Sequence, residues 1–407
     1  MRRLTSGATL AAFRTPGFGP LWLSSAAAAF GHAVSVVAIG WITLQVSNSA
    51  LAVGAAFAAR LVPSLLLGIA LGNVVDRFDR ARTLVLVNVL GVVPLIAGAA
   101  LIGQLDADIV GLLVLSLALG VIDTLRGTAT QAYTFDLAGP AGATNAIALA
   151  NLGGFLLGVA GSIIGGIVLD WAGTRNTFLL AAAATAVAGA VLVAARRRSP
   201  SGPQAPRPER VAPSLGRSLT LIARNRPVAL IALIVIVAET FGFSGATLFP
   251  TFARDVLGSD ASGLGTLVAA RYAGSIASLL LVARVGMGGT GGFAILLTTF
   301  GLGASLLGFA VSNVFVVSLA LMVVVGAASA ALDSVVQARL QHVVDDAERG
   351  SAVGIWYFAV GFGPIGNLGL GAAAGAIGAP PALAVSGALL AVFAVGLSTL
   401  RRARRLL

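Results

Sequence analysis

Seven ionisable side chains lie inside long apolar stretches of this 407-residue chain. A charge at mid-bilayer costs on the order of 2.5 to 3.5 kcal/mol on insertion scales, so each such group needs a partner or a wet surrounding. Residues of this kind either bind and release protons or neutralise one another and charged ligands. The seven are His32, Arg60, Asp123, Arg126, Glu239, Arg271 and Asp333.

Four of these residues are candidates for proton coupling. Glu239 is the best of them, because it lies about halfway along its apolar stretch with no charge three or four positions away; a structural hydrogen bond across helices is the alternative. Asp123 releases a proton when Arg126 comes closer, or the two simply neutralise each other, because residues i and i+3 share a helix face. His32 is a proton relay or a neutral hydrogen-bonding residue. Asp333, nearer the end of its stretch, is structural or a further proton site.

The buried arginines and the nearby aromatic residues are candidates for contact with a ligand. We expect Arg60 and Arg271 to pair with carboxylates across a helix bundle, although an anionic substrate such as a catecholate or carboxylate would suit them as well. An aromatic lining suits a broad amphipathic substrate, and a plain packing role is the simpler explanation for any one of these side chains. The aromatic candidates are Phe30, Trp41, Phe241, Phe243, Trp356 and Tyr357.

The composition places these residues in membrane-spanning helices. A chain that is 57% hydrophobic and 10% charged, with a mean hydropathy of +0.98, does not fit a water-exposed surface. About 20 apolar residues cross a bilayer, and the first stretch is too long for a cleavable signal. The apolar runs predict twelve spans, at about 20–46, 51–75, 83–103, 109–133, 145–169, 176–195, 227–250, 262–285, 292–311, 314–338, 351–374 and 380–400.

The basic residues predict the orientation. All 26 are arginine, and 21 of them fall in the loops or tails on the side of the chain termini. By the positive-inside rule, both termini are expected to be cytoplasmic, in a multi-pass protein of the bacterial cytoplasmic membrane. The net charge of +11 therefore records orientation and does not indicate a nucleic-acid partner.

The composition also excludes several kinds of chemistry. Without cysteine and with only two histidines, the chain is expected to form no disulfide and no metal site. It has no lysine and no G-x-x-x-x-G-K-[ST] loop, which excludes direct coupling to ATP, and no catalytic triad stands on a soluble scaffold. We therefore expect a protein that is not an enzyme and holds no cofactor.

A segment rich in arginine and proline divides the spans into two sets of six. It covers 196–226 and holds five prolines, so it is expected to be a solvated cytoplasmic linker. The linker is either a tether that lies near anionic lipid headgroups or a regulatory docking site. The six-helix bundles on either side are expected at 1–195 and at 227–407, the second with a basic cytoplasmic tail. An offset of 211 residues aligns Arg60 with Arg271, so the bundles are expected to be pseudo-repeats.

The loop after the second predicted span carries a recognisable motif. Its sequence, GNVVDRFDRAR at 72–82, resembles the G-x-x-x-D-R-x-G-R-[KR] signature of the major facilitator superfamily, with an aspartate in the second glycine position. The stretches at 13–25 and 47–84 and the pair Arg349-Gly350 look like the branch that holds enterobactin-type and macrolide exporters, which are drug:proton antiporters. The candidate latch residues of this loop are Gly72, Asp76, Arg77, Asp79, Arg80 and Arg82.

The latch hypothesis rests on helix electrostatics. The N-terminus of the eleventh span, near 351–354, presents unpaired amides and a positive dipole that favour an anion. Asp76, at the end of the second span, is expected to contact that terminus, to hold the two halves in an outward-open state and to release when the halves rock. A plain topogenic role for the arginines accounts for part of the motif.

The resemblance implies an all-α membrane protein with the major facilitator fold, in which spans one, four, seven and ten line a central cavity. It implies a secondary transporter, most simply an exporter of amphipathic drug-like or siderophore-like molecules driven by inward proton flow. Its expected partners are a small-molecule substrate, protons and the lipid bilayer, with the chain acting as a monomer. A non-transporting receptor or assembly partner, an importer of the same fold and a channel are the alternatives.

Overall fold

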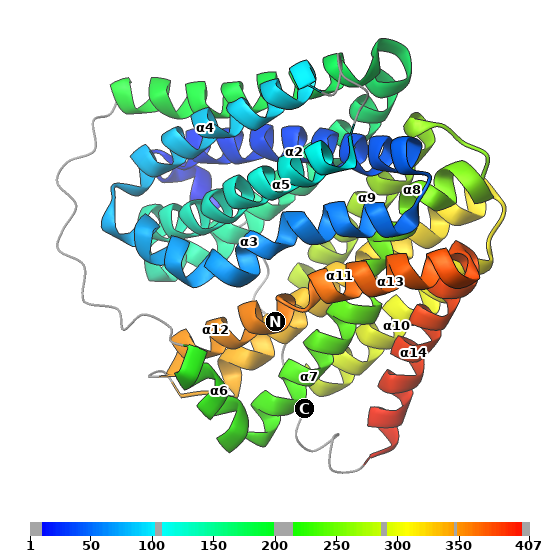
Figure 1. Ribbon diagram of the computed structural model, residues 1–407. Helices are drawn as coiled ribbons and strands as arrows, with labels where there is room; N and C mark the ends of the chain where they lie inside the picture. Colours follow the sequence, from blue (N-terminus) through cyan, green and yellow to red (C-terminus); the bar gives the residue numbers. More distant parts are fainter. Residues whose placement is uncertain (1–9, 102–107, 199–214, 286–290, 346–347, 401–407) are drawn as a thin grey trace.

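The computed structural model describes residues 10–101, 108–198, 215–285, 291–345 and 348–400, and all regular elements within these ranges are helical. The first group of helices, drawn from blue to green in Figure 1, comprises η1 (Ala11–Arg14), α2 (Phe18–Ser47), α3 (Ala50–Arg77), α4 (Arg80–Leu101) and α5 (Ile109–Arg198). The second group comprises α6 (Leu215–Arg224), α7 (Arg226–Phe241), η2 (Phe243–Leu248), α8 (Phe249–Thr251), η3 (Phe252–Val256), α9 (Ala261–Val285), α10 (Gly291–Val311), α11 (Phe315–His342), α12 (Arg349–Val360), α13 (Gly363–Ile377) and α14 (Ala379–Thr399).

Each predicted span corresponds to a helix, to part of a helix or to consecutive helical segments of the structure. In the described part of the chain, ten helices are long and apolar enough to cross a membrane. One of them, Asn145–Arg197, passes twice because it bends at Gly173, and the shorter apolar helix Ala50–Leu66 makes a further pass. Together they give the expected twelve passes. The linker region holds one feature that the sequence analysis did not anticipate, the ten-residue helix α6.

Glycine permits the sharp bends between consecutive spans. Gly139 and Gly173 have φ angles of 65° and 78° inside α5, a left-handed conformation that most L-residues avoid. They divide α5 into three passes. The turn from α2 to α3 works differently, because Asn48 adopts a φ of 49° and Ser49 accepts a hydrogen bond from the Ala52 amide at 3.3 Å. Ser49 thereby serves as the N-cap of α3.

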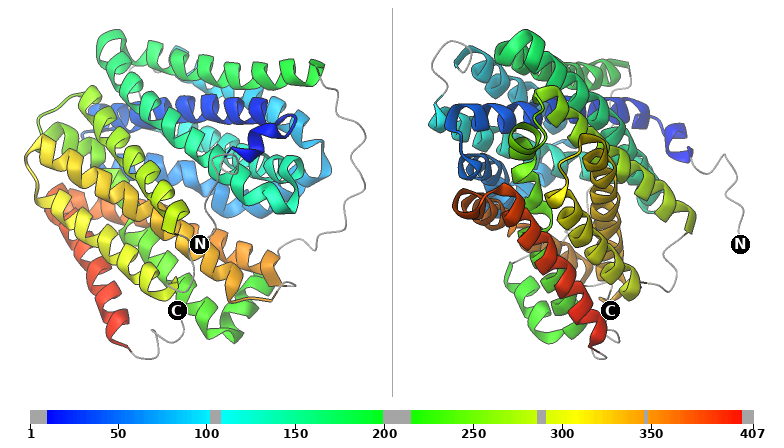
Figure 2. Two further views of the ribbon diagram at one scale, coloured as in Figure 1. Left: turned by 180° about the vertical axis from the view of Figure 1, so that it is seen from behind. Right: turned by 90° about the vertical axis from the view of Figure 1, so that its right-hand side faces the viewer.

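The two groups of helices lie side by side in the views of Figure 2. We call the end of the bundle that carries Asn48 and Asp260 the distal end, because it is opposite the end at which α2 begins and α14 finishes. Close helix crossings join the groups on this side of the bundle. A Cβ atom on Gly54 would overlap the carbonyl oxygen of Asn367, and one on Gly166 would overlap that of Ala261.

The glycines of the fifth and eleventh passes serve mainly in packing. A Cβ on Gly158 would lie 3.1 Å from the Tyr272 ring, and one on Gly371 would lie 2.8 Å from the carbonyl oxygen of Ala50. Gly369 is different, because nothing lies within 4 Å of the place where its Cβ would be. Small residues at such crossings let helix backbones approach closely.

Candidate functional site

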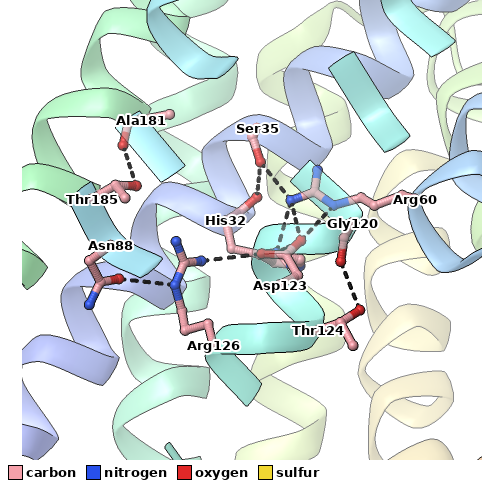
Figure 3. Close-up of polar contacts among 10 residues, drawn as sticks. All are labelled: His32, Ser35, Arg60, Asn88, Gly120, Asp123, Thr124, Arg126, Ala181 and Thr185. Atoms are coloured by element: carbon pink, nitrogen blue, oxygen red, sulfur yellow. Dashed lines mark hydrogen bonds and ion pairs between the residues drawn. The ribbon is translucent and has the colours of Figure 1, made fainter. Parts of the chain in front are cut away.

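Asp123 is the centre of an ion cluster inside the first group of helices (Figure 3). Its carboxylate accepts a hydrogen bond from Arg60 Nε at 2.9 Å and lies 2.8 Å from Arg60 Nη2. Arg126 Nη1 lies 3.2 Å from Oδ1 of Asp123, and His32 Nδ1 lies 3.2 Å from Oδ2, the oxygen that Arg60 contacts. Arg60 and Arg126 thus share a single carboxylate, which leaves one positive charge in excess if His32 is neutral.

Neighbouring polar groups hold this cluster in place. Ser35 on α2 accepts a hydrogen bond from Arg60 Nη2 at 3.1 Å, and Asn88 on α4 accepts one from Arg126 Nε at 3.0 Å. Arg60 is only 8% exposed, and its Nη1 atom has no hydrogen-bond partner among the described residues. The cluster therefore uses most of its donors in positioning and keeps one buried guanidinium nitrogen unpaired.

His32 has two partners that require opposite hydrogen-bonding roles of Nδ1. Its Nδ1 atom lies 3.0 Å from Arg60 Nη2, which can only donate, and 3.2 Å from a carboxylate oxygen of Asp123, which can only accept. A neutral ring with a free Nδ1 lone pair accepts from Arg60, whereas a ring protonated at Nδ1 donates to Asp123. The tautomer of the imidazole therefore decides which of the two partners Nδ1 binds.

The corresponding residues of the second group lie close together without direct contact. Glu239 on α7, Arg271 on α9 and Asp333 on α11 are near enough to interact electrostatically. No hydrogen bond or ion pair of at most 4.0 Å joins any of their side chains to another described residue. Arg271 therefore lacks the carboxylate partner that was expected for it, while Arg60 has one. Glu239 is also the most deeply buried of the three, with 8% of its surface exposed.

A shared helix crossing explains why the two clusters differ. In the first group, α3 crosses the fourth pass where a Cβ on Gly120 would overlap the carbonyl oxygen of Arg60. In the second group, α9 crosses α11 where a Cβ on Gly326 would overlap the carbonyl oxygen of Arg271. Asp123 follows Gly120 by three residues, whereas Asp333 follows Gly326 by seven. The second carboxylate is therefore about one helical turn farther along its helix, out of contact with its arginine.

The crossing at Gly120 leads to a testable expectation. Gly120→Ala should lower the free energy of unfolding by about 1 to 3 kcal/mol, because the added methyl must displace the α3 backbone that carries Arg60. Gly127→Ala is the matched control on the same helix, since nothing lies within 4 Å of its Cβ position. Thermal unfolding in detergent would check both variants. Equal melting temperatures for the two would contradict the expectation that the close approach of α3 at Gly120 makes a methyl group there destabilising.

Within the described part of the chain, four hydrogen bonds join the two groups of helices at the distal end. The Asp170 carboxylate, at the end of the fifth pass, accepts from the Ala261 amide at 3.1 Å and from the Ser262 amide at 2.7 Å. The Arg254 guanidinium donates to the Leu44 carbonyl at 3.3 Å and to the Asn48 side chain at 2.6 Å. An acid thus caps the N-terminus of α9 and a base caps the C-terminus of α2, each in the orientation that the helix dipole favours.

The described latch-loop residues make contacts within the first group of helices. Asp79 accepts from the Arg82 amide at 2.6 Å, as a cap of α4, and pairs with Arg196 at 2.8 Å. Arg80 pairs with Asp136 at 2.6 Å. The aspartate in the second glycine position of the motif therefore has a structural use. The side chains on which the latch hypothesis depends lie outside the described residues, namely those of Gly72, Asp76, Arg77 and the 351–353 segment.

The aromatic candidates occupy different environments. Trp41 is 6% exposed and lies in the hydrophobic core, which fits the packing explanation. Phe30, Phe241, Phe243 and Trp356 are partly buried against that core, and the Tyr357 side chain lies outside the described part. Sequence reasoning missed Tyr272, which packs its ring on Gly158 and Phe155 of the other group. Among the described residues, no group of three or more acids or histidines could hold a metal ion.

Comparisons with known proteins add a family and a fold. A family model described as "Transmembrane secretion effector" matches residues 7–404. Similar solved structures include a bacterial homologue of the human lysosomal transporter Spinster in an inward-facing, unoccupied conformation, with a TM-score of 0.74, 13% identity, and coverage of 99% of this chain and 98% of that chain. They also include the nucleoside transporter NupG, as a mutant, with a TM-score of 0.71, 15% identity, and coverage of 93% and 99%. No curated protein matches the chain.

A POT family transporter in complex with 5-aminolevulinic acid is a further similar structure, with a TM-score of 0.78 and 10% identity over 95% of this chain and 96% of that chain. At such low identities the likeness shows a shared fold alone.

Proposed function

Because this chain belongs to the transmembrane secretion effector family, within the major facilitator superfamily, we propose that it exports amphipathic small molecules in exchange for protons. The membership makes the protein a multi-pass membrane transporter, and the predicted major facilitator fold is confirmed. Efflux, proton coupling and the drug-like or siderophore-like substrate class are our additions. We place the protein in a bacterial cytoplasmic membrane with both termini inside, so that the distal end faces outward.

The observation that supports proton coupling is the unpaired carboxyl group of Glu239. It is 8% exposed, lies inside the seventh pass and makes no hydrogen bond to another described residue. A carboxyl group in such a place can hold a proton as a neutral acid and release it when water or a cation reaches it. Asp123, in contrast, is already engaged by Arg60 and Arg126, which fits a structural anchor better than a proton carrier.

The distal contacts support alternating access as the mechanism. Beside the close helix crossings, the two groups of helices are joined at the distal end by hydrogen bonds that the side chains of Arg254 and Asp170 make with helix termini. Such contacts can be broken and reformed without repacking a core, as a rocking motion of two halves around a midplane site requires. With the distal end facing outward, the structure corresponds to a state that is closed to the outside.

Transport in liposomes tests the proposal. The purified protein, reconstituted with an imposed pH gradient, should move at least one member of a panel of amphipathic compounds against protons. Glu239→Gln should abolish the gradient-driven flux of that compound while leaving counterflow exchange measurable. Glu348→Gln, which changes an exposed glutamate outside the spans, is the control. Full gradient-driven flux in the Glu239→Gln protein would refute the coupling, and net flux with the proton gradient would indicate an importer.

A further inference from the structure

Two interrupted helices meet beside Glu239. The seventh pass stops being α-helical at Phe241, two residues beyond Glu239, and continues as the 3₁₀ helix η2. The eleventh pass is divided into α12, which ends at Val360, and α13, which begins at Gly363. A Cβ atom on Gly363 would lie 3.3 Å from Oε2 of Glu239. The carboxyl group of Glu239 is therefore beside the first residue of a helix that begins inside the membrane.

The start of α13 is suited to stabilising a negative charge. Its fifteen residues carry a helix dipole, and the first amides of a helix lack intrahelical partners. Interrupted helices of transporters direct such N-termini at anionic groups near the bilayer midplane. Glu239 has no hydrogen bond to a described residue, and the charged groups that face it are Asp333 on α11 and Arg271 on α9. The start of α13 is thus one of the groups that influence whether Glu239 is charged.

The same helix forms part of the boundary between the two halves of the protein. The Cβ position of Gly363 that faces Glu239 is also 3.1 Å from Leu61 on α3. Farther along α13, Asn367 approaches Gly54 and Gly371 approaches Ala50, both on α3. At its first residue, α13 is therefore in contact both with the carboxyl group of Glu239 and with Leu61 of the other half. A displacement of α3 would be transmitted to the start of α13.

We propose that the N-terminus of α13 couples proton binding at Glu239 to the movement of the halves, with Gly363 as the positioning residue. When α3 presses α13 against α7, the helix terminus favours the carboxylate and the proton leaves to water. When α3 moves away, α13 relaxes, the carboxylate loses this stabilisation, and Glu239 takes a proton from water. The inference rests on the proposed function in one respect, namely that Glu239 carries the coupled proton.

Glycine is needed at 363 for this contact. Any side chain there must displace either the Glu239 carboxyl group or the Leu61 side chain, because its Cβ would lie within 3.3 Å of both. The methyl of Gly363→Ala is thus expected to move the carboxyl group away from the helix terminus. Gly369→Ala adds the same methyl two turns later in α13, where nothing lies within 4 Å. It is the matched control for any general effect on the helix.

Infrared spectroscopy of the full chain in lipid nanodiscs tests the inference with the proton as the only ligand. A carboxylic-acid band that is absent from Glu239→Gln would identify the Glu239 proton. In Gly363→Ala this band should persist to higher pH than in wild type, by about half a pH unit. In Gly369→Ala it should follow wild type. An unchanged titration in Gly363→Ala, or an equal displacement in Gly369→Ala, would overturn the inference.

A second variant covers the case in which Gly363→Ala does not fold. Leu61→Ala removes the side chain that backs α13 from the other half, so it should displace the band in the same direction. Leu66→Ala, at a position on α3 that is 70% exposed, is its control. Loss of the band on addition of sodium ions at constant pH would overturn the assignment of the proton as ligand. If wild type shows no Glu239 band at all, the proposed function itself fails. If the band is present but its pH dependence is the same in wild type, Gly363→Ala and Leu61→Ala, only the coupling through α13 is refuted.

Discussion

The double variant Asp170→Asn, Arg254→Gln is expected to open the distal end of the protein. Each wild-type side chain makes two hydrogen bonds across the boundary between the halves, and both residues are charged. Hydrogen bonds to charged groups contribute about 1.5 to 3 kcal/mol each, and less when exposed to solvent and salt. A net loss of about 3 kcal/mol would change the ratio of closed to open molecules on the order of a hundredfold.

Electron–electron distance measurements between spin labels can detect this change directly. The chain has no cysteine, so labels can be attached at Val110 and Val314, exposed residues at the distal starts of the fourth and tenth passes. We expect the double variant to show a longer distance population that is minor in wild type. High salt should enlarge that population in wild type too, because it screens the contacts.

Arg175→Gln is the control for this experiment. Arg175 is the other distal-end arginine, is exposed, and makes no hydrogen bond or ion pair to a described residue. Its replacement should leave the distance distribution as in wild type. If Arg175→Gln and the double variant behave alike, general surface charge and not the helix-terminus contacts would hold the distal end closed.

The contacts at the distal end are expected not to change with pH near neutrality through Asp260. Asp260 caps the same terminus of α9, and hydrogen bonds from the Ser262 hydroxyl and the Gly263 amide hold its pKa below the usual value. A carboxylate whose pKa is lowered by folding stabilises the folded protein fully at any pH above its ordinary pKa. This stabilisation is lost only as the pH falls through the lowered pKa. Asp260 therefore stays charged at neutral pH. A distal opening that responds to pH near neutrality would therefore have to originate at another group.

The sequence predicts the spans well because a bilayer imposes a length and a composition on each of them. It does not predict the interruptions in the seventh and eleventh passes. Both interruptions contain glycine, and the glycines at 361 and 363 would fit a continuous helix that packs closely on a neighbour as well as a helix break. Whether a glycine lies in a continuous crossing or at a break depends on the neighbouring helix, which a single sequence does not specify.

The charged residues show a similar division. The pairing of Asp123 with Arg126 follows from helical spacing, whereas its shorter contact with Arg60 depends on the depth at which α3 crosses the fourth pass. The same dependence on depth explains why Arg271 and Asp333 do not meet. The sequence does contain a signal for the distal contacts. The positive-inside rule leaves few basic residues in the loops on the distal side, and Arg254 is one of the two arginines in those loops. An arginine in that position needs a local partner.

Asp123→Asn is expected to be the most destabilising single substitution of the buried charges. The carboxylate is shared by Arg60 and Arg126, so its removal leaves two guanidinium groups without a counter-charge among the described residues. Removing one partner of a buried ion pair typically costs about 3 to 5 kcal/mol, mostly because the remaining charge is left unpaired. Asp333→Asn is the matched control in the equivalent pass of the other half. It should change the melting temperature little, because Asp333 makes no ion pair with another residue that the structure describes.

A double variant separates lost attraction from unpaired charge. If the excess positive charge causes the loss, then adding Arg60→Gln to Asp123→Asn should restore part of the stability, because it removes the guanidinium that is 8% exposed. If the two residues contributed independently, the double variant would instead be less stable than either single one. Thermal unfolding of the four proteins in one detergent distinguishes these outcomes. A restored melting temperature would mean that the cluster around Asp123 tolerates the loss of one charge only when a second, opposite charge is lost with it. This property is expected of a structural anchor that keeps its protonation state while Glu239 exchanges the proton.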